Sequence, residues 1–349
     1  MKTKNFVVGI LCLVVLLVIF FSITTKSQKP EEQPKFETIL IGTGGAPHWS
    51  PDGATLAFMS GGWLCVKSAD GKGEIKKVAE IRPDFFEWMS DSEFVVYERE
   101  YPKAESIAVM PRLSIKRIAI DGQVTSVVRD TTFSKTSPPK ITKPMVLSDG
   151  TVGYYECEGG FKDWGCNVFK IIKPGKLSPD SATKQLRCVI SPYPTGDISV
   201  ESIDHSIKKK ITSGKQKYSF PRLSPDNTKI LAEVASYTSD IAILDLHGNE
   251  LCRLDVGAKH ISPGLFTVAS AVGASWSPDS KKILYHLSTE DGHEVYDLDI
   301  YIVNADGTGK IQIAATSGEK EGGASWSPDG TKIAYVNGTT GKIYVVKVE

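Results

Sequence analysis

The chain has 349 residues, with 41 basic and 41 acidic side chains and therefore a formal net charge of zero. Nucleic-acid binding needs a basic face, and this balance gives no sign of one, so we expect no nucleic-acid partner. The length is ample for a single domain with a large buried core.

The first 35 residues contain a candidate membrane anchor. The uncharged run 6–23 has 18 apolar or small residues, which is enough to cross a bilayer, and Lys2 and Lys4 before it favour a cytoplasmic N-terminus. A cleaved signal peptide, the alternative, usually has a shorter core and a clearer Ala-x-Ala-like site. We therefore expect a cytoplasmic stub (1–5), a single transmembrane signal anchor (6–23) and a flexible polar linker (24–35). The remaining chain would then lie outside the cytoplasm, for example in a periplasm.

From residue 36 onward, one short phrase recurs, which we call the signature: Trp or Leu, Ser, Pro, Asp, then Gly, Ser or Asn. Pro suits the first central position of a type I turn, Asp can bond nearby backbone, and Gly tolerates the conformation that follows. Each signature precedes a run with strand character, such as 55–59 or 332–336. The clear copies are 49–53, 223–227, 276–280 and 326–330, and the weaker copies are 88–92, 147–150 and 177–181.

A second turn follows in many copies, where Asp-Gly stands between two strand-like runs, as at 70–71, 121–122 and 306–307. Asp-Gly in this context is a strong hairpin signal. Each unit therefore offers about four antiparallel strands, a to d, with the signature joining a to b and the Asp-Gly turn joining c to d. Sheets of four strands that repeat at about 40–50 residues are typical of β-propeller blades, so we predict an all-β propeller for residues 36–349.

The two ends of this region are expected to meet in one blade. The last copy offers only three strands, whereas 36–41 precedes the first signature without a blade of its own. We infer that 36–41 supplies the outer strand of the final blade, which leaves no open strand edge between blades. The signature Trp should lie between adjacent blades, because its large ring covers much area there.

The number of blades stays open between six and seven, with seven slightly favoured. Six signatures are well placed, and the copy at 177–181 would be the seventh. Between residues 143 and 217 there are about six strand-like runs, too many for one four-stranded blade and too few for two.

The signature with its preceding Trp, the strand beginning Gly196-Asp197-Ile198 and the closing Ile211-Thr212-Ser213-Gly214 together resemble the WD40-like (PD40) repeat of TolB-type β-propellers. The resemblance covers residues 36–349. It implies an extracytoplasmic propeller that serves as a platform for binding other proteins, and it implies no activity.

No linear motif assigns a catalytic, metal or cofactor site. Gly-x-Ser-x-Gly, His-Glu-x-x-His and the phosphate-binding glycine loops do not occur. None of the six histidines lies three or four residues from another, so we interpret them as turn or surface residues. The acidic stretch 290–299 departs from the calcium-loop pattern, and we interpret it as a solvated loop, with calcium binding as the less favoured reading.

Cys157 and Cys166 are the candidate structural disulfide. They flank a hairpin-like loop and could be bonded in an oxidising compartment, the alternative being two unlinked thiols. The other cysteines outside the anchor are Cys65, Cys188 and Cys252, so their odd total leaves at least one thiol unpaired.

Three functions remain open. We favour a non-catalytic, membrane-tethered platform for a protein or peptide partner, without a cofactor; loops on a rigid scaffold, such as 101–112 and 161–164 with their aromatic residues, are where binding usually occurs. One alternative is an enzyme, for example a metal-dependent lyase or hydrolase, whose site at the channel mouth is built from several blades. The other is a structural spacer of the cell envelope. The sequence assigns no binding residue.

Overall fold

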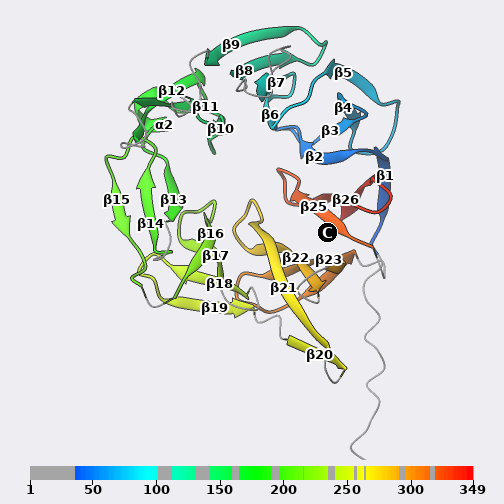
Figure 1. Ribbon diagram of the computed structural model, residues 1–349, viewed down its shortest axis with the longest axis vertical. Coiled ribbons are helices and arrows are strands. Elements are labelled where there is room, and N and C mark those ends of the chain that lie inside the picture. The colour runs from blue at the N-terminus through cyan, green and yellow to red at the C-terminus, as the bar shows by residue number, and fades with distance from the viewer. Residues whose placement is uncertain are drawn as a thin grey trace, which may run out of the picture. The chain divides into compact units, whose positions relative to one another are not determined.

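Seven antiparallel sheets follow one another around a common centre, which makes residues 36–348 an all-β, seven-bladed propeller (Figure 1). The computed structural model describes residues 36–100, 112–130, 141–158, 165–190, 196–214, 216–234, 240–254, 258–262, 265–290, 295–314 and 319–348. The predicted signal anchor 6–23, with the stub and linker around it, lies outside these residues, as do most of the loops 101–112 and 161–164. In the part of the chain that is described, no helix is both long enough and apolar enough to span a membrane.

Five sheets contain four or more strands. Blade 1 consists of β2 (Gly45–Trp49), β3 (Thr55–Ser60), β4 (Trp63–Ser68) and β5 (Lys76–Glu80), and blade 2 of β6 (Phe85–Ser90), β7 (Glu93–Glu100), β8 (Arg112–Ala119) and β9 (Val124–Asp130). Blade 5 consists of β16 (Tyr218–Leu223), β17 (Lys229–Val234), β18 (Asp240–Asp245) and β19 (Glu250–Leu254). Blade 6 consists of β20 (Ala258–Ser262), β21 (Leu265–Trp276), β22 (Lys282–Glu290), β23 (Val295–Asn304) and β24 (Ile311–Ala314). Blade 7 consists of β25 (Glu321–Trp326), β26 (Lys332–Asn337), β27 (Lys342–Lys347) and β1 (Thr38–Thr43).

Within the described residues, the remaining two blades have three strands each, so the prediction of four-stranded blades is wrong for this part of the chain. Blade 3 consists of β10 (Met145–Val146), β11 (Val152–Glu158) and β12 (Gly165–Lys173), and blade 4 of β13 (Leu186–Ile190), β14 (Ile198–Ser202) and β15 (Lys208–Lys210). These are the six strand-like runs that fitted neither one blade nor two. They form two blades of three strands each, because each of these blades lacks one of the four usual strands.

Backbone hydrogen bonds show which strands are omitted. In blade 1, the N–H of Ala69, in the turn after strand c, donates to the carbonyl of Ala54, just before strand b (2.9 Å). In blade 4, Ile203 makes the same bond to Gln185, just before β13 (3.0 Å), so β13, β14 and β15 are strands b, c and d. Blade 3 instead begins with the strand a that precedes its signature. The connection 174–185 therefore replaces strand d of blade 3 and strand a of blade 4.

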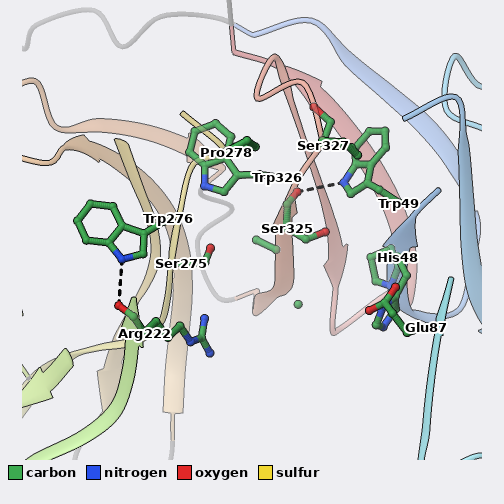
Figure 2. A pocket seen from close by; sticks show the side chains of 14 residues that line it. His48, Trp49, Glu87, Arg222, Ser275, Trp276, Pro278, Ser325, Trp326 and Ser327 are labelled. Atoms are coloured by element: carbon green, nitrogen blue, oxygen red, sulfur yellow. Dashed lines mark hydrogen bonds and ion pairs between the residues drawn. The ribbon is translucent and has the colours of Figure 1, made fainter. Parts of the chain in front are cut away.

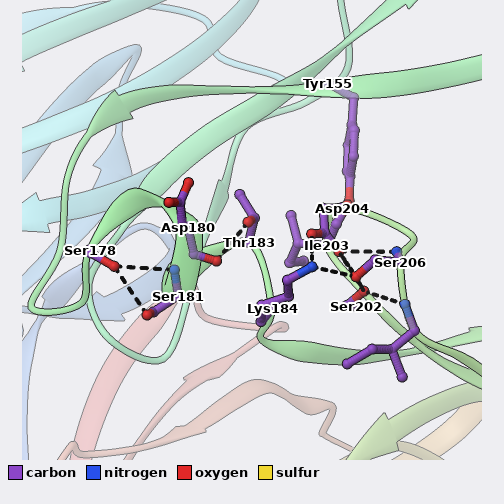
Figure 3. A network of polar contacts seen from close by, with 11 residues as sticks. Tyr155, Ser178, Asp180, Ser181, Thr183, Lys184, Ser202, Ile203, Asp204 and Ser206 are labelled. Atoms are coloured by element: carbon purple, nitrogen blue, oxygen red, sulfur yellow. Dashed lines mark hydrogen bonds and ion pairs between the residues drawn. The ribbon is translucent and has the colours of Figure 1, made fainter.

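The signature copy at 177–181 forms a helix rather than the predicted turn. It holds α2 (Pro179–Ala182), whose N-cap Ser178 accepts a hydrogen bond from the backbone N–H of Ser181 (3.3 Å) (Figure 3). Ser at the N-cap and Pro in the first turn are also helix-start signals. Without a strand a to pair with strand b, this copy is not held in the turn conformation of the others.

The clear signatures form one turn with a shared set of hydrogen bonds. In blade 1, the Ser50 hydroxyl donates to the Asp52 carboxylate (2.6 Å) and accepts from the N–H of Thr55 (2.9 Å), while the N–H of Gly53 donates to the carbonyl of Ser50 (2.8 Å). The residue after Asp is left-handed, with φ of 71° at Gly53 and 58° at Asn227. Gly and Asn tolerate this conformation best, and Ser280 adopts it as well, with φ of 63°.

These turns should make stability sensitive to acid. The serine hydroxyl lowers the pKa of the signature carboxylates Asp52, Asp226, Asp279 and Asp329. At Asp149 of blade 3, burial raises the pKa, but hydrogen bonds from Thr151 and Gln185 outweigh it and bring the value from 3.8 to about 2. A pKa lowered by folding contributes stability that is complete above the unfolded value and is lost as pH falls through the folded one.

We therefore expect the free energy of unfolding to decrease between about pH 4 and about pH 2, measured by urea unfolding at fixed ionic strength. Asp149→Asn should show a shallower decrease than the wild type. If Asp149→Asn lost stability with falling pH as steeply as the wild type, the lowered pKa of Asp149 would not contribute to the acid sensitivity.

The chain ends meet as predicted. β1 pairs antiparallel with β27, with Ile39 opposite Val345 and Leu40 opposite Tyr344 (Figure 1). Outside the ladder, the Lys347 ammonium contacts the Glu37 carboxylate at 2.8 Å. One sheet therefore contains both ends of the propeller, and no edge is left between blades 7 and 1.

The signature tryptophans connect neighbouring blades, which confirms their predicted place. The indole N–H of Trp49 donates to the carbonyl of Ser325 in blade 7 (3.2 Å), and that of Trp88 to the carbonyl of His48 in blade 1 (3.1 Å). Trp276 likewise donates to Arg222 in blade 5 (3.1 Å). In each case the acceptor directly precedes the Trp or Leu of the neighbouring signature.

The backbone of blade 3 places Cys157 of β11 directly opposite Cys166 of β12. Opposite residues of an antiparallel pair have Cα atoms about 4.5–5.5 Å apart, inside the range that a disulfide spans. We predict that peptide mapping without reduction, on protein from an oxidising compartment, will recover 157 and 166 in one cross-linked peptide. Cys65, Cys188 and Cys252 are free thiols and should be alkylated after unfolding. Recovery of all five cysteines as alkylated thiols would contradict the bond.

Candidate functional site

One position of the repeat supplies different side chains to a common cavity. We call it the pre-signature position: the residue directly before the Trp or Leu of each signature. The pre-signature residues of blades 1, 2, 5, 6 and 7 all line a cavity of about 680 Å³ (Figure 2): His48, Glu87, Arg222, Ser275 and Ser325.

The rest of the cavity wall is mainly apolar. Trp49, Trp276 and Trp326 line it together with prolines of the same strands and turns: Pro47, Pro278 and Pro328. Aromatic walls with a few polar groups are typical of ligand sites. The cavity thus combines a repeated apolar frame with polar residues that differ from blade to blade.

Blades 1 and 2 contribute a hydrogen-bonded acid–imidazole pair. Nδ1 of His48 lies 2.9 Å from Oε2 of Glu87, and Oε1 of Glu87 accepts from the backbone N–H of Trp88 (3.0 Å). The His48 ring also packs on Phe86, with ring centres 4.5 Å apart. These contacts fix the imidazole, because a carboxylate that engages one ring nitrogen also sets the role of the other.

Blade 5 contributes a cation. Nη1 of Arg222 donates to the carbonyl of Ala274 (2.5 Å), which leaves most of the five guanidinium donors for other partners. Across the described part of the chain, no carboxylate forms an ion pair with Arg222. Figure 2 shows Arg222 on the opposite side of the view from the His48–Glu87 pair.

Blades 6 and 7 contribute buried polar atoms without partners. Among the residues described, no hydrogen bond is made by Oγ of Ser275, Oγ of Ser325 or Nε1 of Trp326. Buried polar groups are normally satisfied, so three unsatisfied groups around one cavity need an explanation. The Trp326 indole also departs from the pattern of Trp49, Trp88 and Trp276, each of which donates to the preceding blade.

A second cavity of about 410 Å³ shares Trp49 and Glu87 with the first and continues toward blade 3. Its lining includes Phe85, Lys143 and Val146, the last being the pre-signature residue of blade 3. The Lys143 ammonium lies over the Phe85 ring, 4.2 Å from its centre.

The residues singled out from the sequence lie elsewhere. Asp297 and Asp299 of the acidic stretch lie in β23, where Asp299 accepts from the side-chain amide of Gln312 (3.1 Å), and 291–294 lie outside the described residues. Within the described ranges, no three His, Cys, Asp or Glu residues are grouped closely enough to hold a metal ion.

The interpretation of the histidines as turn or surface residues was wrong at His286. His48 is a wall residue of the cavity, and His286 is buried in β22, where its Nε2 lies 3.3 Å from the N–H of Ala324. The pre-signature position would have identified His48, because aligning the repeats isolates one variable residue beside a constant Trp.

No protein-family model matches the sequence, and no curated protein matches it. Solved structures do match. A protein assigned as TolB from Agrobacterium tumefaciens is 16% identical over 90% of this chain and 100% of its own, with a TM-score of 0.40. The C-terminal WD40 domain of Sif2 is 13% identical over 90% of this chain and 98% of its own, with a TM-score of 0.48. An oligogalacturonate lyase from Vibrio parahaemolyticus is 13% identical over 88% of this chain and 78% of its own, with a TM-score of 0.40. The chain's own seven sheets make it a β-propeller.

Proposed function

We propose that the protein is a binding platform whose cavity at the pre-signature residues holds a segment of a protein or peptide partner. One observation carries the proposal: five structurally equivalent positions, on five blades, place five side chains of mixed chemistry around one cavity of about 680 Å³. A propeller needs the signature Trp and turn for its blades. It does not need His, Glu, Arg and Ser at the residue before.

The proposal is tested with the full-length chain and a display library of random short peptides. Peptides enriched on the wild type are measured for affinity to the double variant His48→Ala/Glu87→Ala, which loses one wall pair. The matched control is Lys208→Ala/Lys209→Ala, on the exposed strand β15 of blade 4. We expect the wall variant to bind at least about tenfold more weakly, a loss of about 1.4 kcal/mol. The control variant should bind as tightly as the wild type. Equal loss in both variants, or no enriched peptide, would refute the cavity as the site.

The His48–Glu87 pair supports a second candidate, an enzyme with its site at the same cavity. An imidazole held by a carboxylate is the arrangement of a general base. This candidate expects His48→Gln to abolish turnover of a substrate while its affinity changes little, whereas a binding platform expects the affinity itself to fall.

We also propose that residues 6–23 tether the propeller to a membrane with residues 36–349 on the extracytoplasmic side. The support is the length and apolar character of this run and the two lysines before it. Extraction of the full chain from membranes should then require detergent. Protease added to cells whose outer layer has been made permeable should digest residues 36–349. A chain that is released by salt alone would contradict the tether.

A further inference from the structure

Phe220 in strand a of blade 5 has a backbone conformation that bulky residues rarely adopt. Its φ is 48°, in the left-handed region, and its side chain is 68% exposed. The equivalent residues, three positions before the signature Trp or Leu, are Gly273 in blade 6 and Gly323 in blade 7, with φ of 64° and 59°. All three lie at the same irregularity, because the pairing of strands a and b shifts register just there in each blade.

Blades 6 and 7 have glycine at this left-handed bulge, where blade 5 has Phe220. A left-handed bulky residue is strained, and such strain is concentrated at functional sites. Burial does not compensate for it, since most of the Phe220 side chain meets solvent. A strained aromatic residue that contributes little to the core is explained by contact with something outside the chain.

Repeat equivalence places Phe220 at the rim of the cavity. Gly323, its counterpart in blade 7, lines the cavity, and so does Arg222, two residues after Phe220. Blade 5 thus presents an aromatic ring and a guanidinium from one short segment. Glu233 lies within electrostatic reach of Arg222, but it is buried and already accepts from the N–H of Gly273 (3.1 Å).

We propose that Phe220 and Arg222 recognise a peptide segment in which an aspartate or glutamate lies next to a large apolar side chain. The guanidinium would take the carboxylate with paired hydrogen bonds, which suits a cation that has no ion pair among the described residues. The Phe220 ring would pack on the apolar neighbour, and aromatic and arginine residues are the usual centres of binding energy. This inference rests on the proposed function and names the chemistry of its partner.

The test uses the peptides that the library selects on the full-length wild-type chain. We expect the enriched sequences to share an acidic residue within two positions of an aromatic or large aliphatic one. Phe220→Gly and Arg222→Gln should each bind them at least about tenfold more weakly, or about 1.4 kcal/mol. Leu251→Ala is the control, since Leu251 is 54% exposed on β19 of the same blade. Leu251→Ala should bind the enriched peptides as tightly as the wild type does.

Thermal unfolding distinguishes a loss of peptide affinity from a loss of protein stability. Phe220→Gly should unfold at the same temperature as the wild type or higher, because glycine relieves the left-handed strain, although its affinity falls. Enriched peptides without an acidic residue, or full affinity in both variants, would overturn this inference while leaving the cavity as a binding site. If no peptide is enriched, both the inference and the proposed function fail.

Discussion

Replacing Ile41 by aspartate should lower the free energy of unfolding by more than about 4 kcal/mol, the range of a charge buried without a partner. Ile41 is 1% exposed and belongs to a core cluster with Trp49, Phe58 and Val345, which lies where blade 1 meets the closing blade. A carboxylate there would lose its hydration and find only apolar neighbours. It would also loosen β1, the strand that completes the closing sheet. Urea unfolding followed by circular dichroism at neutral pH measures the change.

The neighbouring residue supplies the matched control. Leu40 lies in the same strand but is 52% exposed, so Leu40→Asp places the same charge in solvent. We expect its free energy of unfolding to stay within about 0.5 kcal/mol of the wild type. Equal destabilisation by the two substitutions would mean that charge in β1, rather than burial at the joint between the blades, is responsible.

The fold could be predicted from sequence because its determinants are local. The signature fixes a turn through contacts between residues at most five apart, such as Ser50 with Asp52 and Thr55. The strand that follows each turn can be recognised from its own residues, because each signature precedes a run with strand character. The closure by β1 also followed, since a final unit with three strands needs a fourth and the first residues had no blade.

Blades 3 and 4 could not be assigned in this way. A signature states where strand b begins, but it does not state whether a strand a precedes it. At 177–181 the same Ser-Pro-Asp phrase caps the helix α2, because no paired strand holds it as a turn. The two omitted strands would have to lie in residues 174–185, which instead contain the signature copy 177–181 and the helix α2.

The cavity was beyond sequence reasoning for a different reason. His48 and Arg222 are 174 positions apart, and only the closed ring brings them to one wall. A search for linear motifs cannot find such a site. Comparing equivalent positions of the repeats could, and the same comparison exposes Phe220 against Gly273 and Gly323.

Trp88→Ala should destabilise the propeller by about 3–5 kcal/mol, the usual range for removing a buried large aromatic side chain. Trp88 is 2% exposed, packs on Phe94 with ring centres 4.1 Å apart, and lies in the cluster shared by blades 1 and 2. Trp88→Phe retains much of this packing but leaves the carbonyl of His48 without the indole donor, which should cost about 1 kcal/mol.

Trp326→Phe makes the same chemical change at the joint between blades 6 and 7. There the indole N–H has no partner among the described residues, so its removal should cost less than at Trp88. Urea unfolding of both phenylalanine variants, compared as a difference, tests whether the interblade hydrogen bond is responsible. If Trp326→Phe is destabilised as much as Trp88→Phe, the indole of Trp326 has an acceptor in solution. The joint between blades 6 and 7 would then be as tightly bonded as that between blades 1 and 2.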